Sequence, residues 1–244
     1  MPLSVISQGK MAIDRKEIVD AALQLLNEAG IDKLSTRALA ARLGVAQPAL
    51  YWHFRNKNDL LDAVNTEMLA RYRASRVPRR GEAWDAYTLA KARSFRKALL
   101  AVRDGARVNA GTRPGQGEFA EFEQQLALYV DAGFSPESAL HVSIAVARYV
   151  LGFVLEEQGE RQRTDDRDQD HDPMNQVAAF PLLATGVKAL MAGGSINTDS
   201  AFEAGLNYMV AGMRMSLGKT ASSRGGHASP AHKQKRRLTA PLKT

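Results

Sequence analysis

Two short amphipathic segments separated by a glycine turn lie within residues 33–58, and they restrict the fold more than any other feature of the chain. The first segment is predicted to be helical over residues 36–43, with Gly44 as its stop. Pro48 is favoured at the first position of a helix and opens the second segment, which we expect to end near His53. Two short helices joined by such a turn are typical of the helix-turn-helix motif, whose second helix enters the major groove of DNA.

The charge distribution supports the same interpretation. The chain has a formal net charge of +7, but residues 219–244 contain seven basic and no acidic residues, so residues 1–218 are neutral, with 26 basic against 26 acidic side chains. Residues 33–58 contain no acidic residue, and their basic residues are Lys33, Arg37, Arg42, Arg55 and Lys57. A cationic stretch in an otherwise neutral chain is expected for contact with DNA phosphates. The alternative is a plain helical bundle, which gives no reason to exclude acidic residues here.

The remaining segments also favour helices. Asp14 and Glu17 have the spacing of a capping box, and Gly30 is placed to end the helix that they begin. Further helices are expected from residue 56, and over 82–102, 117–132, 136–160, 174–191 (weaker, and interrupted by Pro181) and 198–217. The segment RVNAGTRPG, residues 107–115, is expected to interrupt this pattern. A charged loop is expected at 161–173, and a disordered tail at 219–244 that either adds nonspecific DNA affinity or is inert.

The two long helices expected at residues 136–160 and 198–217 have wide apolar faces. Together they present more hydrophobic surface than one subunit needs, which predicts a homodimer with a four-helix interface. The alternative is that both helices bury these faces within a single subunit.

Several classes of protein are excluded by what the sequence lacks. There is no cysteine, so disulfides and cysteine-based metal or nucleophile chemistry are ruled out. No uncharged apolar run reaches the roughly 18 residues of a membrane span, and no secretory signal is evident, so a cytoplasmic protein with no membrane partner is expected. The acidic run at 165–172 lacks the glycine and glutamate of a calcium loop. No acid–base or nucleophile pair is present, so the chain is not expected to be an enzyme.

The run TRALAARLGVAQPALYWHFRNKNDLLDA, residues 36–63, closely resembles the DNA-binding segment of the tetracycline repressor (TetR) family. The later segments AKARSFRKALLAVRDGARVNAGTRP, FEQQLA, AGFS and LGFVLEEQ resemble the core of family members that bind tetracycline, so the resemblance extends over about residues 14–217. It implies an all-α fold with an N-terminal helix-turn-helix three-helix module and a larger helical ligand-binding and dimerisation domain. The expected divisions are a flexible N-terminus (1–13), a DNA-binding domain (14–60), a ligand-binding and dimerisation domain (61–218) and the basic tail (219–244).

The resemblance implies a dimeric repressor that binds double-stranded operator DNA with palindromic half-sites and is released by a small-molecule effector. The residues that it places at the DNA are Thr36, Arg37, Gln47, Pro48, Ala49, Tyr51, Trp52, His53 and Lys57. The chemistry agrees, because Gln47 can pair with adenine and Arg37 with guanine, while Pro48 or Ala49 can contact a thymine methyl group. For Trp52 and Leu50 the alternative is packing between helices, and we expect it for at least one of them, above all for Leu50.

The resemblance also implies a ligand-binding set: Arg73, Lys91, Phe95, Asn109, Thr112, Arg113, Pro114, Phe122, Gln125, Leu126 and Glu156. Three of these depart from the pattern of tetracycline-binding members. Asn109 stands where those members have a histidine that binds magnesium, Arg73 replaces a drug-contacting histidine, and Lys91 replaces a drug-contacting asparagine.

These departures predict an effector other than the tetracycline–magnesium chelate, such as a carboxylate-bearing or polycyclic natural product. No cofactor or metal site is expected, and magnesium would enter only with a tetracycline-like chelate. If Arg73 and Lys91 face the pocket they favour an anionic ligand group. The alternative is that each pairs with a carboxylate or extends to solvent. The rival functional hypothesis is an effector-independent DNA-binding protein with a degenerate pocket.

Overall fold

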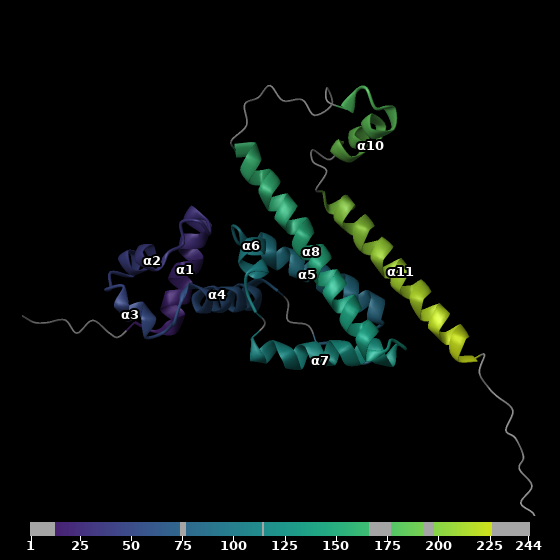
Figure 1. Cartoon of the computed structure of the whole chain (residues 1–244), viewed down its shortest axis with the longest axis horizontal. Helices are drawn as coiled ribbons and strands as arrows, with labels where there is room; N and C mark the ends of the chain where they lie inside the picture. Colours follow the sequence, from purple (N-terminus) through teal and green to yellow (C-terminus); the bar gives the residue numbers. More distant parts are fainter. Residues whose placement is uncertain (1–12, 74–76, 114, 166–176, 193–197, 226–244) are drawn as a thin grey trace, which may run out of the picture.

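The computed structural model describes residues 13–73, 77–113, 115–165, 177–192 and 198–225, and within them the chain forms helices and connecting turns without a strand (Figure 1). The expected all-α class is confirmed. The helices are α1 (Arg15–Ala29), α2 (Thr36–Leu43), α3 (Pro48–Tyr51), α4 (Lys57–Tyr72), α5 (Trp84–Leu100), α6 (Gly105–Ala110), α7 (Gln116–Asp131), α8 (Pro136–Asp165), α10 (Pro181–Met191) and α11 (Asp199–Gly225).

Local signals set the ends of the first helices as predicted. The Asp14 carboxylate accepts a hydrogen bond of 2.7 Å from the Glu17 amide, and the Glu17 carboxylate accepts one of 3.0 Å from the Asp14 amide. Gly30 ends α1 at a φ of 81°, and Gly44 ends α2 in the left-handed region at a φ of 64°. At these positive φ angles the backbone of any residue with a Cβ is strained, so glycine is favoured at both positions. α3 ends earlier than predicted, at Tyr51.

Three expectations for the larger part of the chain are wrong in part. The first half of RVNAGTRPG belongs to α6, because Val108 is buried there and Arg107 forms an ion pair with Asp32. α8 continues to Asp165, five residues into the expected charged loop. α11 continues to Gly225, into the expected disordered tail. The helix expected over 174–191 is divided before Pro181, since residues 178–180 are not helical and Pro181 begins α10. Residues 1–12, 166–176 and 226–244, on which other expectations fall, lie outside the described part.

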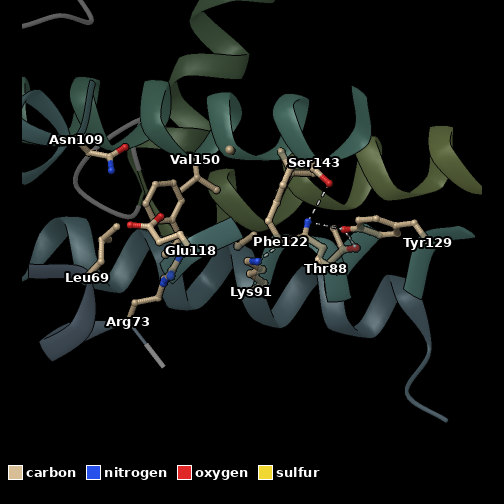
Figure 2. A pocket seen from close by; sticks show the side chains of 15 residues that line it. Leu69, Arg73, Thr88, Lys91, Asn109, Glu118, Phe122, Tyr129, Ser143 and Val150 are labelled. Atoms are coloured by element: carbon tan, nitrogen blue, oxygen red, sulfur yellow. Dashed lines mark hydrogen bonds between the residues drawn. The ribbon is translucent and has the colours of Figure 1, made fainter. Parts of the chain in front are cut away.

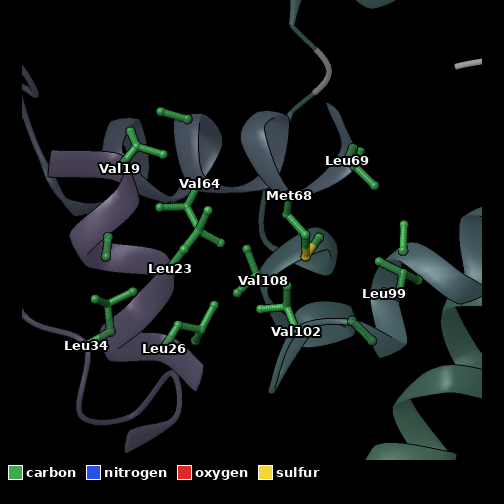
Figure 3. Packing of buried hydrophobic residues seen from close by; sticks show 14 of the residues in the cluster. Val19, Leu23, Leu26, Leu34, Val64, Met68, Leu69, Leu99, Val102 and Val108 are labelled. Carbon is green, nitrogen blue, oxygen red and sulfur yellow. The ribbon is translucent and has the colours of Figure 1, made fainter. Parts of the chain in front are cut away.

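One hydrophobic core joins the two parts of the molecule. Figure 3 shows Leu23 and Leu26 of α1 facing Val64 and Met68 of α4, beside Val108 of α6. The same cluster continues to α8 and α11 through residues such as Val150, Val154, Phe202 and Leu206. α4 crosses the domain boundary expected at residues 60 and 61, so its displacement would move the DNA-binding end relative to the rest.

A second, smaller cluster lies where α7 turns into α8. Trp84, Tyr129 and Phe134 form three edge-to-face ring contacts with centroids 5.1–6.2 Å apart, and Ala139 and Val142 complete the cluster. Such aromatic pairs add about 0.5–1.5 kcal/mol each beyond the area that they bury. They fix the end of α7 against α5 and α8, which positions the polar residues described below.

Residues 136–162 of α8 are long and apolar enough to cross a bilayer, since they contain an 18-residue stretch with a mean hydropathy of 1.7. Length and composition are weak indications, because the central helix of a bundle meets the same test. α8 packs against α5, α6, α7 and α11, and it buries Val146, Val150 and Val154 among them. We therefore interpret its apolar character as that of a core helix.

Candidate DNA-binding surface and ligand cavity

α2, α3 and the turn after α3 present alternating exposed and buried side chains at one end of the molecule (Figure 1). Trp52 is 89% exposed and Tyr51 49%, whereas Leu50 and Phe54 are 2% and 5% exposed. Leu50 therefore lies in the core, as predicted. The two exposed rings form the rim of a hollow with His53, Arg55 and Arg15.

Gln47 is held in place by two neighbours. Its side-chain Nε2 donates to the Thr36 hydroxyl at 2.8 Å and to the Tyr51 hydroxyl at 3.4 Å. These bonds connect the first residue of α2 to the start of α3 and restrict the rotamers of Gln47. A base-reading amide that is already oriented loses less entropy when it meets a base edge.

The cations of residues 33–58 are not equally available. Arg42 donates two hydrogen bonds of 2.6 and 2.7 Å to the Glu28 carboxylate, and Arg55 pairs with Asp59 at 2.9 Å. Lys33, Arg37 and Lys57 are exposed and make no ion pair with described residues. Residues 33–58 contain no acidic residue, but in the folded structure carboxylates of α1 and α4 pair with two of their cations.

A cavity of about 260 Å³ lies among α4, α5, α7 and α8 (Figure 2). It is mostly apolar, and its lining residues are Leu69, Arg73, Thr88, Lys91, Ala92, Phe95, Asn109, Glu118, Phe122, Gln125, Tyr129, Ser143, Val146, Ala147 and Val150. Figure 2 shows Asn109 and Arg73 toward one end, Thr88, Ser143 and Tyr129 toward the other, and Lys91 between them. An apolar cavity with a few convergent polar groups is typical of a small-molecule site.

A chain of hydrogen bonds crosses the inner wall of this cavity. Lys91 donates to the amide oxygen of Gln125, whose Nε2 donates to the Ser143 hydroxyl at 3.0 Å. The Tyr129 hydroxyl lies 2.8 Å from that of Thr88, and burial raises the pKa of Tyr129 above its usual value. Each of these buried polar groups has a partner, so the wall is rigid in the absence of a ligand.

Arg73 and Lys91 both line the cavity. The Arg73 guanidinium forms an ion pair of 3.5 Å with Glu121, and its side chain is 17% exposed. Lys91 makes no such pair among the described residues and instead lies 5.6 Å from the centre of the Tyr87 ring. Burial lowers the pKa of Lys91 to about 8, and repulsion from Arg73 adds to this effect.

The structure brings six of the expected ligand-binding residues to the cavity: Arg73, Lys91, Phe95, Asn109, Phe122 and Gln125. Thr112, Arg113, Leu126 and Glu156 do not line it. The Arg113 amide donates to Asp62 of α4 at 3.2 Å, Leu126 packs in the aromatic cluster, and Glu156 is exposed on α8. Pro114 lies outside the described residues.

Sequence reasoning missed most of the contribution of α8. Ser143, Val146, Ala147 and Val150 recur at helical spacing and read as an ordinary core stripe, so no local signal marks them as cavity residues. Tyr129 of α7 was missed for the same reason, and Glu118 was missed because a charged residue in the first turn of a helix is usually exposed.

α6 and the turn before it connect the cavity to the DNA-binding end. On one side, the Asn109 amide nitrogen donates to Asn65 of α4 at 3.0 Å. On the other, the Arg103 guanidinium donates to the Glu28 carbonyl at 3.1 Å, and the Ile31 amide donates to Asp104 at 2.9 Å. A change at Asn109 is therefore within a few bonds of both α4 and the end of α1.

Comparisons with known proteins show the family of the chain. A family model described as "Bacterial regulatory proteins, tetR family" matches residues 18–64, and one described as "Tetracyclin repressor-like, C-terminal domain" matches residues 77–217. The tetracycline repressor protein class A from transposon 1721 of Escherichia coli is 45% identical over 196 residues, which are 80% of this chain and 88% of that protein.

Two solved structures have a similar arrangement of helices over most of their length. A TetR variant from Acinetobacter baumannii AYE in complex with minocycline matches with a TM-score of 0.67 and 39% identity, over 84% of this chain and 98% of that one. TetR (class A) in complex with 5a,6-anhydrotetracycline and magnesium matches with a TM-score of 0.64 and 38% identity, over 85% and 99% of the two chains.

Proposed function

The chain belongs to the TetR family of bacterial transcriptional regulators, and from this we propose that it is a ligand-responsive repressor that binds a palindromic operator as a homodimer and is released by a small-molecule effector. Members of this family are regulators of transcription and not enzymes. We assign residues 14–60 to DNA binding and residues 61–218 to ligand binding and dimerisation, and we place the protein in the cytoplasm, where its operator would be.

The observation that carries the proposal is the position of α6 between the cavity and the DNA-binding end. Asn109 lines the cavity and bonds to α4, while Asp104 and Arg107 bond to the loop after α1. A ligand that moves α6 would thus shift α4 and α1 together. In a dimer this changes the separation of the two recognition helices, which must match one helical turn of DNA.

The effector that we propose is not the tetracycline–magnesium chelate. The Asn109 amide could offer a divalent cation only a neutral oxygen, and Arg73 and Lys91 place two positive charges in the same cavity. These donors do not fit magnesium. An open cavity nevertheless supports a sensor over the rival hypothesis of a degenerate pocket.

Operator binding measured with and without effectors tests this function. We expect a palindromic operator to be bound at nanomolar concentration and released by a small molecule, with tetracycline and magnesium having little effect. If no class of compound weakens operator binding, the protein is an effector-independent repressor. If tetracycline with magnesium releases the operator efficiently, our assignment of the effector is wrong.

The proposed recognition residues predict a change in base specificity. We expect Gln47→Ala and Arg37→Ala each to cost roughly 1–3 kcal/mol of operator binding and to relax the preference at one defined base pair per half-site. Arg42→Ala is the matched control on the same helix, because Arg42 is already bound to Glu28. Binding to a library of operator variants measures these effects. A loss that is uniform over all sequences would show that Gln47 and Arg37 contact only the phosphates.

The proposed dimer rests on α8 and α11, which lie side by side (Figure 1). α11 exposes a stripe at helical spacing that contains Ala204, Tyr208, Ala211, Gly212 and Met215, and Tyr208 is 78% exposed. A surface of small and apolar residues on a long helix suits a second copy of the chain.

A charge within this stripe should dissociate the dimer. We expect Tyr208→Glu to weaken dimerisation at least about tenfold, because a carboxylate would be desolvated in the interface, and to weaken operator binding with it. Sedimentation over a range of concentrations measures the change, with Tyr208→Phe as the control. A dimer that is unaffected by Tyr208→Glu would place the interface on another surface.

A further inference from the structure

The ligand cavity holds two cationic side chains with different neutralising partners. Arg73 has the Glu121 carboxylate at 3.5 Å, whereas Lys91 makes no ion pair with a described residue. The partner of Lys91 is the neutral amide oxygen of Gln125. Glu118 also lines the cavity, but it forms no ion pair with either cation. The positive charge on Lys91 is therefore only partly compensated.

Leaving Lys91 in this state costs free energy. A protonated amine among apolar side chains is destabilised unless an anion or several hydrogen bonds replace its hydration. The pKa of Lys91 falls to about 8, first because of burial and then because of Arg73, but at pH about 7 the amine remains mostly protonated. The cavity thus presents an only partly compensated cation to whatever enters it.

We propose that the effector is a small apolar carboxylic acid whose carboxylate forms an ion pair with Lys91. Phe95, Phe122 and Val150 would enclose its apolar part, and Arg73 would add a second attraction from α4. The cavity of 260 Å³ lies just below the range of about 300–1,000 Å³ for drug-sized ligands, so the acid is small. This inference rests on the proposed role of the cavity as the sensor site.

A pair of probes of the same shape tests the charge requirement. 2-Naphthoate carries a carboxylate on a flat apolar body, and 2-naphthamide replaces it with a neutral amide. Titration calorimetry without DNA should show naphthoate binding roughly ten- to a hundredfold more tightly than the amide, as expected for a charge-assisted pair. In Lys91→Met this preference should disappear, and in Lys97→Met, an exposed lysine on the same helix, it should remain.

Two further variants separate a charge effect from a packing effect. Glu118→Gln removes a carboxylate from the cavity wall and should strengthen naphthoate binding about threefold, without changing amide binding. Lys91→Arg keeps a cation that does not titrate, so it should retain the preference for naphthoate. Melting temperatures of all variants establish that each one is folded.

The pH dependence gives a second readout. The other ionisable groups around Lys91 are Arg73 on α4, Tyr87 on α5, and Glu118, Glu121 and Tyr129 on α7. Burial raises the pKa of both tyrosines, so they stay neutral between pH about 7 and about 9. Naphthoate affinity should therefore decrease as the pH rises through about 8 in the wild type, and stay constant in Lys91→Arg.

The possible results separate this inference from the proposed function. Naphthoate binding that requires Lys91 but does not affect operator binding would support the acidic ligand class and remove the sensor role. Equal binding of naphthoate and naphthamide would overturn the inference, whatever happens at the operator. If neither probe binds at the highest concentration at which it is soluble, the inference is overturned as well.

Discussion

We expect Gly105→Ala to lower the free energy of unfolding by about 3 kcal/mol, at the upper end of the cost of overpacking. Gly105 is buried at the start of α6, and a Cβ there would lie 2.3 Å from the Leu99 carbonyl oxygen and 3.2 Å from the Met68 sulfur. Real Cβ atoms do not approach other atoms within 3.0 Å, so the backbone must shift. The Leu99 carbonyl also accepts a hydrogen bond from Gln158 of α8, which the shift would break.

Gly111→Ala is the matched control at the other end of α6. Its added Cβ would find no atom nearer than 3.8 Å, and the φ of Gly111 is −92°, which alanine adopts without strain. We expect a change within about 0.5 kcal/mol. Urea denaturation of both variants measures the difference. Equal stability of the two variants would show that the turn between α5 and α6 adjusts freely, and would weaken the argument that α6 transmits a defined displacement.

The second large effect is expected at Asp104, whose carboxylate joins three elements. It accepts hydrogen bonds from the Ile31 amide at 2.9 Å and from Gln162 of α8 at 2.7 Å, and Arg107 lies 3.6 Å away. The side chain is 3% exposed, and the backbone has a φ of 56°. Aspartate and asparagine tolerate this left-handed conformation, and alanine does so less well.

Asp104→Ala should therefore destabilise the fold by about 2–3 kcal/mol, because it removes the buried acceptor of the part-buried hydrogen bonds from Ile31 and Gln162 and adds backbone strain. Asp104→Asn keeps one acceptor and the conformation, and should cost about 1–2 kcal/mol. Asp32→Ala is the control, since it removes a 77%-exposed partner of Arg107 and should cost less than about 1 kcal/mol.

The functional consequence is more specific than the loss of stability. Asp104→Asn should remain folded, but its weaker bond to the loop after α1 should reduce the ratio of operator affinities with and without effector. Operator titration at a saturating effector concentration measures this ratio. An unchanged ratio in a folded Asp104→Asn protein would mean that coupling runs through α4 alone.

Local chemistry made much of the fold predictable. Capping groups and glycines act within a few residues, so the limits of α1 and α2 followed from Asp14, Gly30 and Gly44. The helix after residue 160 was not predictable, because it depends on partners elsewhere. Arg161 binds Glu157 one turn back, and Gln162 binds Asp104 on a distant segment. A stretch that looks like a charged loop is therefore held as helix.

By itself, the sequence determined an all-helical chain with a helix-turn-helix, since composition and spacing act locally, while its resemblance to the TetR family implied Arg73, Lys91 and Asn109 as ligand-binding residues. Only the tertiary structure decided which polar groups meet. Helix packing brings Lys91 to Gln125, 34 positions further along the chain, and Gln125 to Ser143, another 18 positions further. The same packing directs the Arg113 amide to α4 and leaves Glu156 in solvent. Contacts over such separations depend on how whole helices pack, and helix packing has no local signal in the sequence.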